Sequence, residues 1–192
     1  MTMICGVDEA GRGPLCGPVF ASAVILDNSL YIKNLDDSKK VTPKIRNEIY
    51  EEIKINAFDY SFATASVEEI DQLNILNASL LAMKRAILML TKKPDEYFVD
   101  GLYAPKIAGC SLTTIIKGDS LIPSISAASI VAKVERDKHM ESLHRLYPQY
   151  ELDTHKGYPT KKHIVLIKKF GVNKIYRKTF KPVKSLINKE DA

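Results

Sequence analysis

Two adjacent carboxylates followed by a glycine-arginine-glycine turn are the feature of this chain best suited to chemistry. Asp8 and Glu9 directly follow the apolar run 3–7, which predicts a strand, and residues 11–13 read Gly-Arg-Gly. Carboxylates at a strand end suit a hard cation such as Mg²⁺, because this ion prefers oxygen ligands. Backbone N–H groups beside one arginine suit a sugar-phosphate backbone. A site with both properties is expected to cut or join phosphodiesters.

Two further acids stand at comparable positions later in the chain. Asp100 ends the apolar run 97–99, Asp119 follows the run 112–116 after a short turn, and each lies beside a glycine. Because strands of one sheet can bring distant acids to a common edge, we expect these acids to meet Asp8 and Glu9. Four carboxylates repel one another unless cations neutralise them. Two divalent ions, Mg²⁺ or Mn²⁺, about 4 Å apart would do so and would clamp both oxygens of an in-line phosphoryl displacement.

Acids after strands are also common as solvated turn residues, and any one of these positions alone fits that interpretation. Three strand ends with the same pattern favour a metal site. Neighbours on a strand point to opposite faces, so Asp8 and Glu9 can share a site only if the strand ends or bulges there. Gly11 makes a bulge possible, and Asp8 is the safer ligand of the two. Asp137 lies in a mixed-charge helical run and is interpreted as part of a solvated face.

Several segments are suited to a nucleic acid. Gly11, Arg12 and Gly13 allow a sugar to approach the backbone, whose amides could bond a phosphate or a 2′-hydroxyl. Ser38 and Lys39 lie in a loop suited to phosphates. Tyr158 could stack on a sugar or base, although such a tyrosine is more often a half-buried loop anchor.

The end of the chain is strongly positive, and its density of charge favours contact with the backbone of a duplex. The basic residues are Lys161, Lys162, Lys168, Lys169, Lys174, Arg177, Lys178, Lys181 and Lys184. A plain solvated surface is the alternative. The histidines His139, His144 and His163 are interpreted as surface helix residues with no assigned role.

The bulk properties fit one globular α/β unit. The chain has 192 residues, 45% of them hydrophobic, and a net charge of +5, which is consistent with a polyanionic partner. Three cysteines without metal-ligand spacing indicate a reducing compartment, and Cys5 is expected in the core. No secretory signal is visible, and apolar runs such as 19–26 are far shorter than the ~20 residues of a membrane span. We expect a cytoplasmic protein without a membrane partner, acting as a monomer.

The pattern of apolar residues predicts a mixed sheet with helices on its faces, because some strands are adjacent in sequence and others alternate with helices. The expected strands cover residues 3–7, 19–26, 58–65, 97–100 and 112–116. Helices are expected from Pro43 and over 74–90, 123–145 and 161–170, and the tail from Asn173 is expected to be extended at its end. We divide the chain into a catalytic domain, 1–145, and a helical, basic extension packed on it, 146–192.

Taken together, these motifs resemble those of bacterial ribonuclease HII, in the same order and over nearly the whole chain. The motifs are residues 7–15, 37–39, 99–101, 117–120, 126–130 with 132–133, and 155–160. The related ribonuclease HIII usually carries a threonine in place of Arg12 and an added N-terminal domain, so the resemblance favours HII.

The resemblance implies an RNase H-like fold, a five-stranded mixed sheet flanked by helices, with a C-terminal helical extension. It implies two-metal cleavage of RNA in RNA–DNA hybrids, and at single ribonucleotides in duplex DNA, leaving 5′-phosphate and 3′-hydroxyl ends. The metal-site acids of the family fall on Asp8, Glu9, Asp100 and Asp119. Its reader of the 2′-hydroxyl falls on residues 11–13 and its sugar-stacking tyrosine on Tyr158.

Two other classes of function fit the sequence less well. A dinucleotide-binding loop would need a helix directly after the glycines, and Pro14, Pro18 and an immediate second strand exclude it. A non-catalytic module that binds hybrids through its basic surface leaves the three acidic strand ends unexplained. The sequence therefore favours the nuclease.

Overall fold

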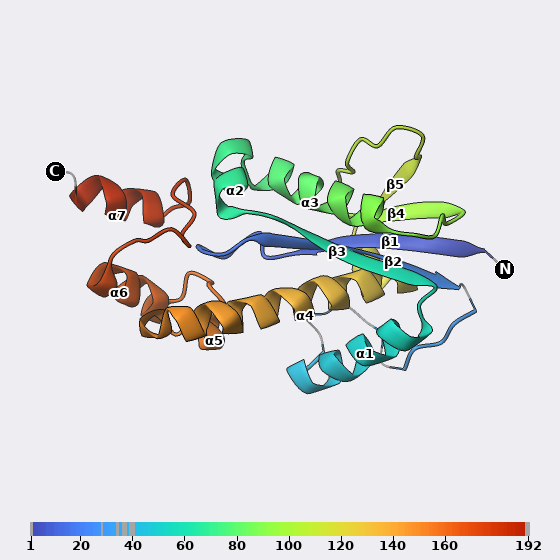
Figure 1. The fold of residues 1–192 in the computed structure, drawn as a ribbon, viewed down its shortest axis with the longest axis horizontal. Helices are drawn as coiled ribbons and strands as arrows, with labels where there is room; N and C mark the ends of the chain where they lie inside the picture. The colour runs from blue at the N-terminus through green and yellow to red at the C-terminus, as the bar shows by residue number, and fades with distance from the viewer. Residues whose placement is uncertain (1, 28, 34, 36–37, 39–40, 191–192) are drawn as a thin grey trace.

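The computed structural model describes residues 2–27, 29–33, 35, 38 and 41–190, and its centre is one sheet with helices on both faces (Figure 1). The strands are β1 (Met3–Ala10), β2 (Val19–Asp27), β3 (Asp59–Ala65), β4 (Glu96–Asp100) and β5 (Leu112–Ile115). The longer helices are α1 (Pro43–Asn56), α2 (Val67–Leu73), α3 (Ile75–Met89), α4 (Pro123–Leu146), α6 (Lys161–Phe170) and α7 (Val183–Glu190). Short turns of helix are η1 (Gly118–Ser120), η2 (Pro148–Tyr150) and α5 (Leu152–His155).

The sheet is mixed, as the sequence predicts, and has the strand order β3-β2-β1-β4-β5. The central strand β1 is antiparallel to β2, and β2 to β3, whereas β1, β4 and β5 run parallel. All five expected strands are present. Strand β1 is longer than expected, because its pairing with β2 continues until Ala10 opposes Phe20.

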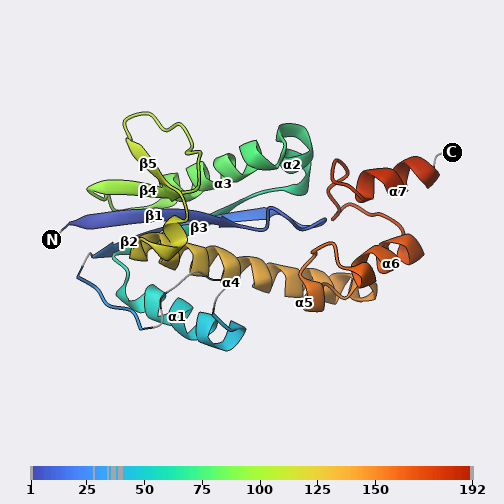
Figure 2. The same ribbon diagram turned by 180° about the vertical axis from the view of Figure 1, so that it is seen from behind.

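The two faces of β1 pack against different helices. Cys5 and Val7 are buried in an apolar cluster with α3, which confirms the expected core position of Cys5. Gly6 faces the start of α4, and the other large cluster joins β2 to α1 and α4. Figure 2 shows this layering from behind, with α3 on one side of the sheet and α4 and α1 on the other.

Local signals explain where the helices begin. Thr42 caps α1 with Pro43 in the first turn, at the start that the sequence predicts. Asn74, expected within the helix 74–90, caps α3 instead. Helix α2 was not expected, although Ser66 and Glu69 form a capping box that marks its start. The expectation of an extended C-terminal end is wrong, because the end of the tail forms α7.

The last part of the chain packs on the connection between β1 and β2. One apolar cluster joins Leu15 and Cys16 of this connection to Met140 of α4 and to Tyr150 and Tyr176 of the C-terminal segments. No helix in the described part of the chain is both long and apolar enough to cross a membrane.

The contact between β1 and α4 leaves no room for a side chain at Gly6. A Cβ there would lie 2.0 Å from the backbone carbon of Ser124 and 2.2 Å from the nitrogen of Ile125. We expect Gly6→Ala to lower the free energy of unfolding by about 3 kcal/mol, because the helix must move off the strand. Chemical denaturation measures the loss. The control, Gly109→Ala, lies in a turn closed by the N–H of Cys110 and the carbonyl of Ile107, meets no atom within 4 Å, and should lose only about 1 kcal/mol from its positive φ. Equal losses would contradict the close approach.

Candidate active site

Three carboxylates from segments distant in sequence meet at one edge of the sheet. Asp8 lies in β1, Asp100 ends β4 and Asp119 lies in η1 after β5, and one oxygen from each lies within 4.8 Å of the others. Asp8 and Asp119 are only 4% and 7% exposed, and Asp100 is partly exposed. Parallel pairing causes this meeting, since Val7 of β1 lies opposite Val99 of β4 and each strand runs on into its acid.

Backbone groups orient these carboxylates. The N–H of Glu9 donates to Asp8 Oδ1 at 2.7 Å, and the N–H of Gly118 donates to Asp100 Oδ1 at 2.7 Å. The hydroxyl of Ser126 in α4 donates to the carbonyl oxygen of Asp119 at 2.6 Å. The three acids are therefore held by the ends of β1 and β4, by η1 and by the start of α4.

Burial and like charges disfavour the ionised form of Asp8. Its pKa is raised well above the usual range, first by desolvation and then by the charges of Glu9 and Asp100. Hydrogen bonds from the Glu9 N–H and from Ser129 lower this pKa in part. A cluster of carboxylate oxygens is the donor set that a hard divalent cation prefers.

Glu9 lies on the other face of β1 and is not among the three acids that meet. The strand neither ends nor bulges at this point, since Asp8, Glu9 and Ala10 pair regularly with β2. Glu9 instead lines a hollow of about 60 Å³ with Asp100 and Arg12, and it accepts a hydrogen bond from Arg12 Nη1 at 3.3 Å. Asp100 therefore borders both the three-acid cluster and the hollow that holds Glu9.

The glycine loop, which comprises Gly11, Arg12 and Gly13, lies beside Tyr158, although the two are far apart in sequence. A Cβ on Gly13 would lie 3.4 Å from the ring of Tyr158, which is 42% exposed. Gly11 has a φ of +98°, and the guanidinium of the buried Arg136 occupies the place of its missing side chain. Arg12 is exposed. The structure thus brings the predicted sugar reader and the predicted stacking tyrosine to one surface.

Of the two loop residues predicted to contact phosphate, Ser38 is buried and Lys39 lies outside the described residues. The hydroxyls of Ser38 and Ser129 are 2.8 Å apart, and Ser129 also bonds Asp8. Arg46 donates to the carbonyl oxygen of Ser38 at 2.9 Å and lies 3.6 Å from Asp137, which also pairs with Lys133. Ser38 thus connects to the acid cluster through Ser129, and Asp137 forms ion pairs with Arg46 and Lys133.

Two buried histidines support the segment that carries Tyr158. Their rings stack with centroids 4.1 Å apart. His163 Nδ1 lies 2.9 Å from the carbonyl oxygen of Tyr158, and Nε2 lies 3.1 Å from the hydroxyl of Tyr176. His155 Nε2 lies 2.8 Å from the carbonyl oxygen of Tyr150, and Nδ1 accepts from the N–H of Gly157. Since a carbonyl only accepts, the proton lies on Nδ1 of His163 and on Nε2 of His155.

Sequence reasoning misplaced two of the residues behind this surface and gave no role to a third. His163 is fully buried, so its interpretation as a surface residue is wrong. Arg177 is also buried and does not belong to the solvated basic surface. Arg136 was not singled out at all. Only contacts between segments distant in sequence bury these side chains, so no local pattern could have identified them.

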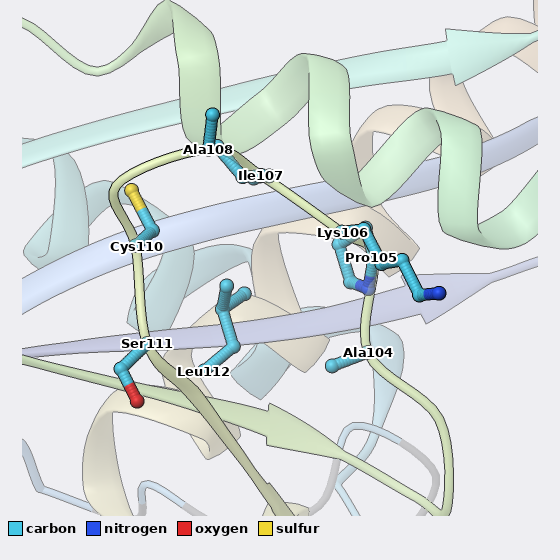
Figure 3. A pocket seen from close by; sticks show the side chains of 8 residues that line it. All are labelled: Ala104, Pro105, Lys106, Ile107, Ala108, Cys110, Ser111 and Leu112. Carbon is cyan, nitrogen blue, oxygen red and sulfur yellow. The ribbon is translucent and has the colours of Figure 1, made fainter.

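A hollow of about 560 Å³ opens elsewhere, beside the loop between β4 and β5 (Figure 3). Its lining runs from Ala104 to Leu112 and includes Lys106, Cys110 and Ser111. None of the predicted site residues lines it. The predicted site residues therefore lie outside this hollow.

Solved structures with the same architecture define the class of protein. A ribonuclease H2 from Pyrococcus horikoshii matches with a TM-score of 0.81 and 25% identity over 98% of both chains. The fold is also that of Bst-RNase HIII in complex with Mn²⁺, with a TM-score of 0.72 over 97% of this chain and 70% of that one. With its acidic cluster at the strand ends, the chain is a nuclease of the RNase H fold.

Sequence comparison narrows the class to one family. The family described as Ribonuclease HII matches residues 5–183. A ribonuclease HII from Nitrosospira multiformis is 52% identical over 190 residues, 98% of this chain and 95% of that one. One from Pelagibacter ubique is 50% identical over 187 residues, 97% of this chain and all of the relative. The chain belongs to the ribonuclease HII family.

Removal of one charge from the cluster should weaken cation binding more than it weakens the fold. We expect Mg²⁺ or Mn²⁺ to raise the melting temperature of the wild type, by the equivalent of about 2.7 kcal/mol at 100 times the dissociation constant. Asp8→Asn should melt no lower than the wild type in chelator, because repulsion with Asp100 is relieved, and should lose most of the rise. Thermal unfolding with metal or chelator measures both effects. If metal raised the melting temperature of Asp8→Asn as much as that of the wild type, the ion would bind elsewhere.

The histidine pair predicts a loss of stability in acid. Burial lowers the pKa of His163 to about 4 and lowers that of His155. The unfolded chain therefore takes up protons below about pH 6.5 that the folded chain does not, and stability falls as the pH drops from there towards 4. Denaturation across this range should show a loss of up to roughly 3 kcal/mol from His163.

The variant His163→Asn isolates this contribution, because it keeps an N–H donor and cannot titrate. Its free energy of unfolding should depend less on pH between 6.5 and 4 than that of the wild type. Parallel pH profiles of the two proteins would contradict the assignment of a neutral His163.

Proposed function

We propose that this protein hydrolyses RNA strands in RNA–DNA hybrids and cuts duplex DNA at single embedded ribonucleotides, leaving 5′-phosphate and 3′-hydroxyl ends. The observation that carries the proposal is the meeting of Asp8, Asp100 and Asp119 beside the glycine loop. Membership of the ribonuclease HII family supports the choice of substrate.

The residues at the strand ends fit divalent cations. All three donors that meet are carboxylate oxygens, and Glu9 and Asp100 place further negative charge beside the buried Asp8. Asp8, Asp100 and Asp119 would hold Mg²⁺ or Mn²⁺, and Glu9 would complete the set from the hollow that it shares with Asp100. A bound pair of such ions supplies an activated water and neutralises the leaving 3′-oxygen.

The remaining residues position the substrate. Gly11 and Gly13 leave the backbone open to a ribose, and their neighbouring amides would bond its 2′-hydroxyl. Tyr158, exposed beside Gly13, would stack on the sugar or base. Arg12 is exposed, as are the lysines of the C-terminal segments Lys161, Lys168 and Lys178, and these would contact phosphates. Ser38 and Lys39 are proposed to help position the same substrate strand. Ser38 would do so indirectly, through its hydrogen bond to Ser129.

The decisive test compares three labelled duplexes: an RNA–DNA hybrid, a DNA duplex with one ribonucleotide, and the same duplex without it. We expect the first two to be cut in Mg²⁺, no cutting in chelator, and no cutting of the third. Ligation of the products checks for 5′-phosphate and 3′-hydroxyl ends. Binding without cutting would instead identify a non-catalytic module.

The variant Asp100→Asn tests the site itself. We expect kcat to fall about 10³-fold, equivalent to roughly 4 kcal/mol of lost transition-state stabilisation, with the fold retained. The control is Asp95→Asn, at the other end of the same strand region, where the carboxylate accepts from the N–H of Met3. Its kcat should stay near the wild-type value. Near-normal activity of Asp100→Asn in Mg²⁺ would show that the site is misplaced.

A further inference from the structure

The buried side chain of Arg177 forms hydrogen bonds with the glycine loop and with the residues that follow it, on the side away from solvent. Its guanidinium donates to four backbone carbonyls between residues 11 and 17. Nη2 bonds Gly11 at 2.7 Å, Nη1 bonds Arg12 at 3.0 Å and Pro14 at 2.8 Å, and Nε bonds Gly17 at 2.9 Å. Arg177 is 0% exposed, so these contacts are made without any access to substrate.

The backbone around Arg177 strengthens the same attachment. Cys16 and Tyr176 form a β-bridge, the N–H of Gly17 donates to Ile175, and the N–H of Arg177 donates to Leu15. From the segment before α6, the carbonyl of Gly157 accepts from the N–H of Leu15 at 2.8 Å. The C-terminal part of the chain therefore makes these hydrogen bonds to the inner side of the loop.

The direction of the carbonyls determines the direction of the amides. In a planar trans peptide, the C=O of one residue and the N–H of the next point in opposite directions. Because the carbonyls of Gly11 and Arg12 point to Arg177, the N–H groups of Arg12 and Gly13 point away from it. That outward side is where Arg12 and Gly13 are exposed and where Tyr158 lies against Gly13.

We propose that Arg177 is a positioning residue for sugar recognition: by turning these carbonyls inward, it presents the amides of the loop to the 2′-hydroxyl of the substrate. The inference rests on the proposed function, and it assigns ribose selectivity in part to a side chain that never touches the nucleic acid. It also gives the C-terminal segment a role in selectivity besides any contribution to affinity.

Only arginine has the donor geometry for this task. Its planar fork carries five N–H donors on three nitrogens, whereas lysine presents three donors from a single nitrogen. One ammonium cannot span carbonyls from Gly11 to Gly17. Burial and the neighbouring Arg136 lower the pKa of Arg177 to about 9, so the guanidinium is still protonated at neutral pH. Arg177→Lys therefore keeps the positive charge and removes the planar fork of N–H donors.

The experiment measures kcat and KM on the duplex with one ribonucleotide, together with the inhibition constant of the all-DNA duplex as competitor. We expect Arg177→Lys to raise KM about tenfold, the effect of losing about one hydrogen bond to the sugar. The inhibition constant of the all-DNA duplex should change less than about twofold, because that duplex offers no 2′-hydroxyl. A merely structural role would reduce the fraction of active protein and so lower kcat with KM unchanged.

Two further variants serve as control and as second test. Arg85→Lys is the control: Arg85 is a part-exposed arginine that pairs with Glu69 and donates to Thr64. Its KM and its inhibition constant should stay within about twofold of the wild type. Phe180→Leu removes the ring 5.0 Å from the guanidinium carbon of Arg177 without touching its hydrogen bonds. We expect a smaller rise in KM in the same direction, and this variant decides the question if Arg177→Lys does not fold.

The outcomes separate the inference from the function on which it rests. A wild type that does not cut the ribonucleotide duplex would overturn the proposed function and the inference with it. A wild type that cuts, with unchanged KM in the folded Arg177 and Phe180 variants, would overturn the inference alone. Equal weakening of the ribonucleotide duplex and its all-DNA competitor would also overturn it, because sugar selectivity would then be intact.

Discussion

The parallel pairing of β1 with β4 is the constraint on which the site depends. It places the ends of two strands from distant parts of the sequence side by side, so Asp8 and Asp100 meet at one edge. The parallel neighbour β5 leads into η1 and adds Asp119. Because β1 also pairs with β2 on its other side, it is the central strand and cannot shift its register without moving its core residues to the wrong face.

The two faces of β1 also determine which helix lies next to which site residues. Gly6 lets α4 approach β1 so closely that Ser129 reaches Asp8, while the odd-numbered residues of β1 face α3. Neutral donors hold the carboxylates: backbone N–H groups for Asp8 and Asp100, and the hydroxyl of Ser129 for Asp8. These donors orient Asp8 and Asp100 and carry no charge of their own.

Sequence patterns were sufficient to predict the strands of the sheet and the meeting of the three acids, because each acid follows a recognisable apolar run. They were sufficient for α1 and α3, whose first turns carry local capping residues. The position of Glu9 could not be settled, since the choice between a strand end and a bulge depends on how far β1 pairs with β2. The resemblance assigns Glu9 to the metal site, and the structure places it on the opposite face, next to Asp100.

The misplaced residues share one physical cause. Arg177 and His163 are polar residues in a basic, helical part of the chain, and composition alone predicts that they are solvated. Both are buried because the C-terminal segments pack on the connection after β1, and their polar atoms are satisfied there by carbonyls and by a tyrosine hydroxyl. A buried polar group needs such partners, and partners distant in sequence leave no periodic signal.

This packing connects chemistry to recognition. Asp8 and the glycine loop are separated by only two residues of chain, so the loop begins at a fixed place relative to the acid cluster. The loop would still be free to turn, since Gly11 and Gly13 have no side chains to restrict it. Arg177 removes that freedom from one side, and the segment from His155 to His163 limits it at Tyr158. The surface that would read a sugar therefore rests on the buried side chains of Arg177 and His163.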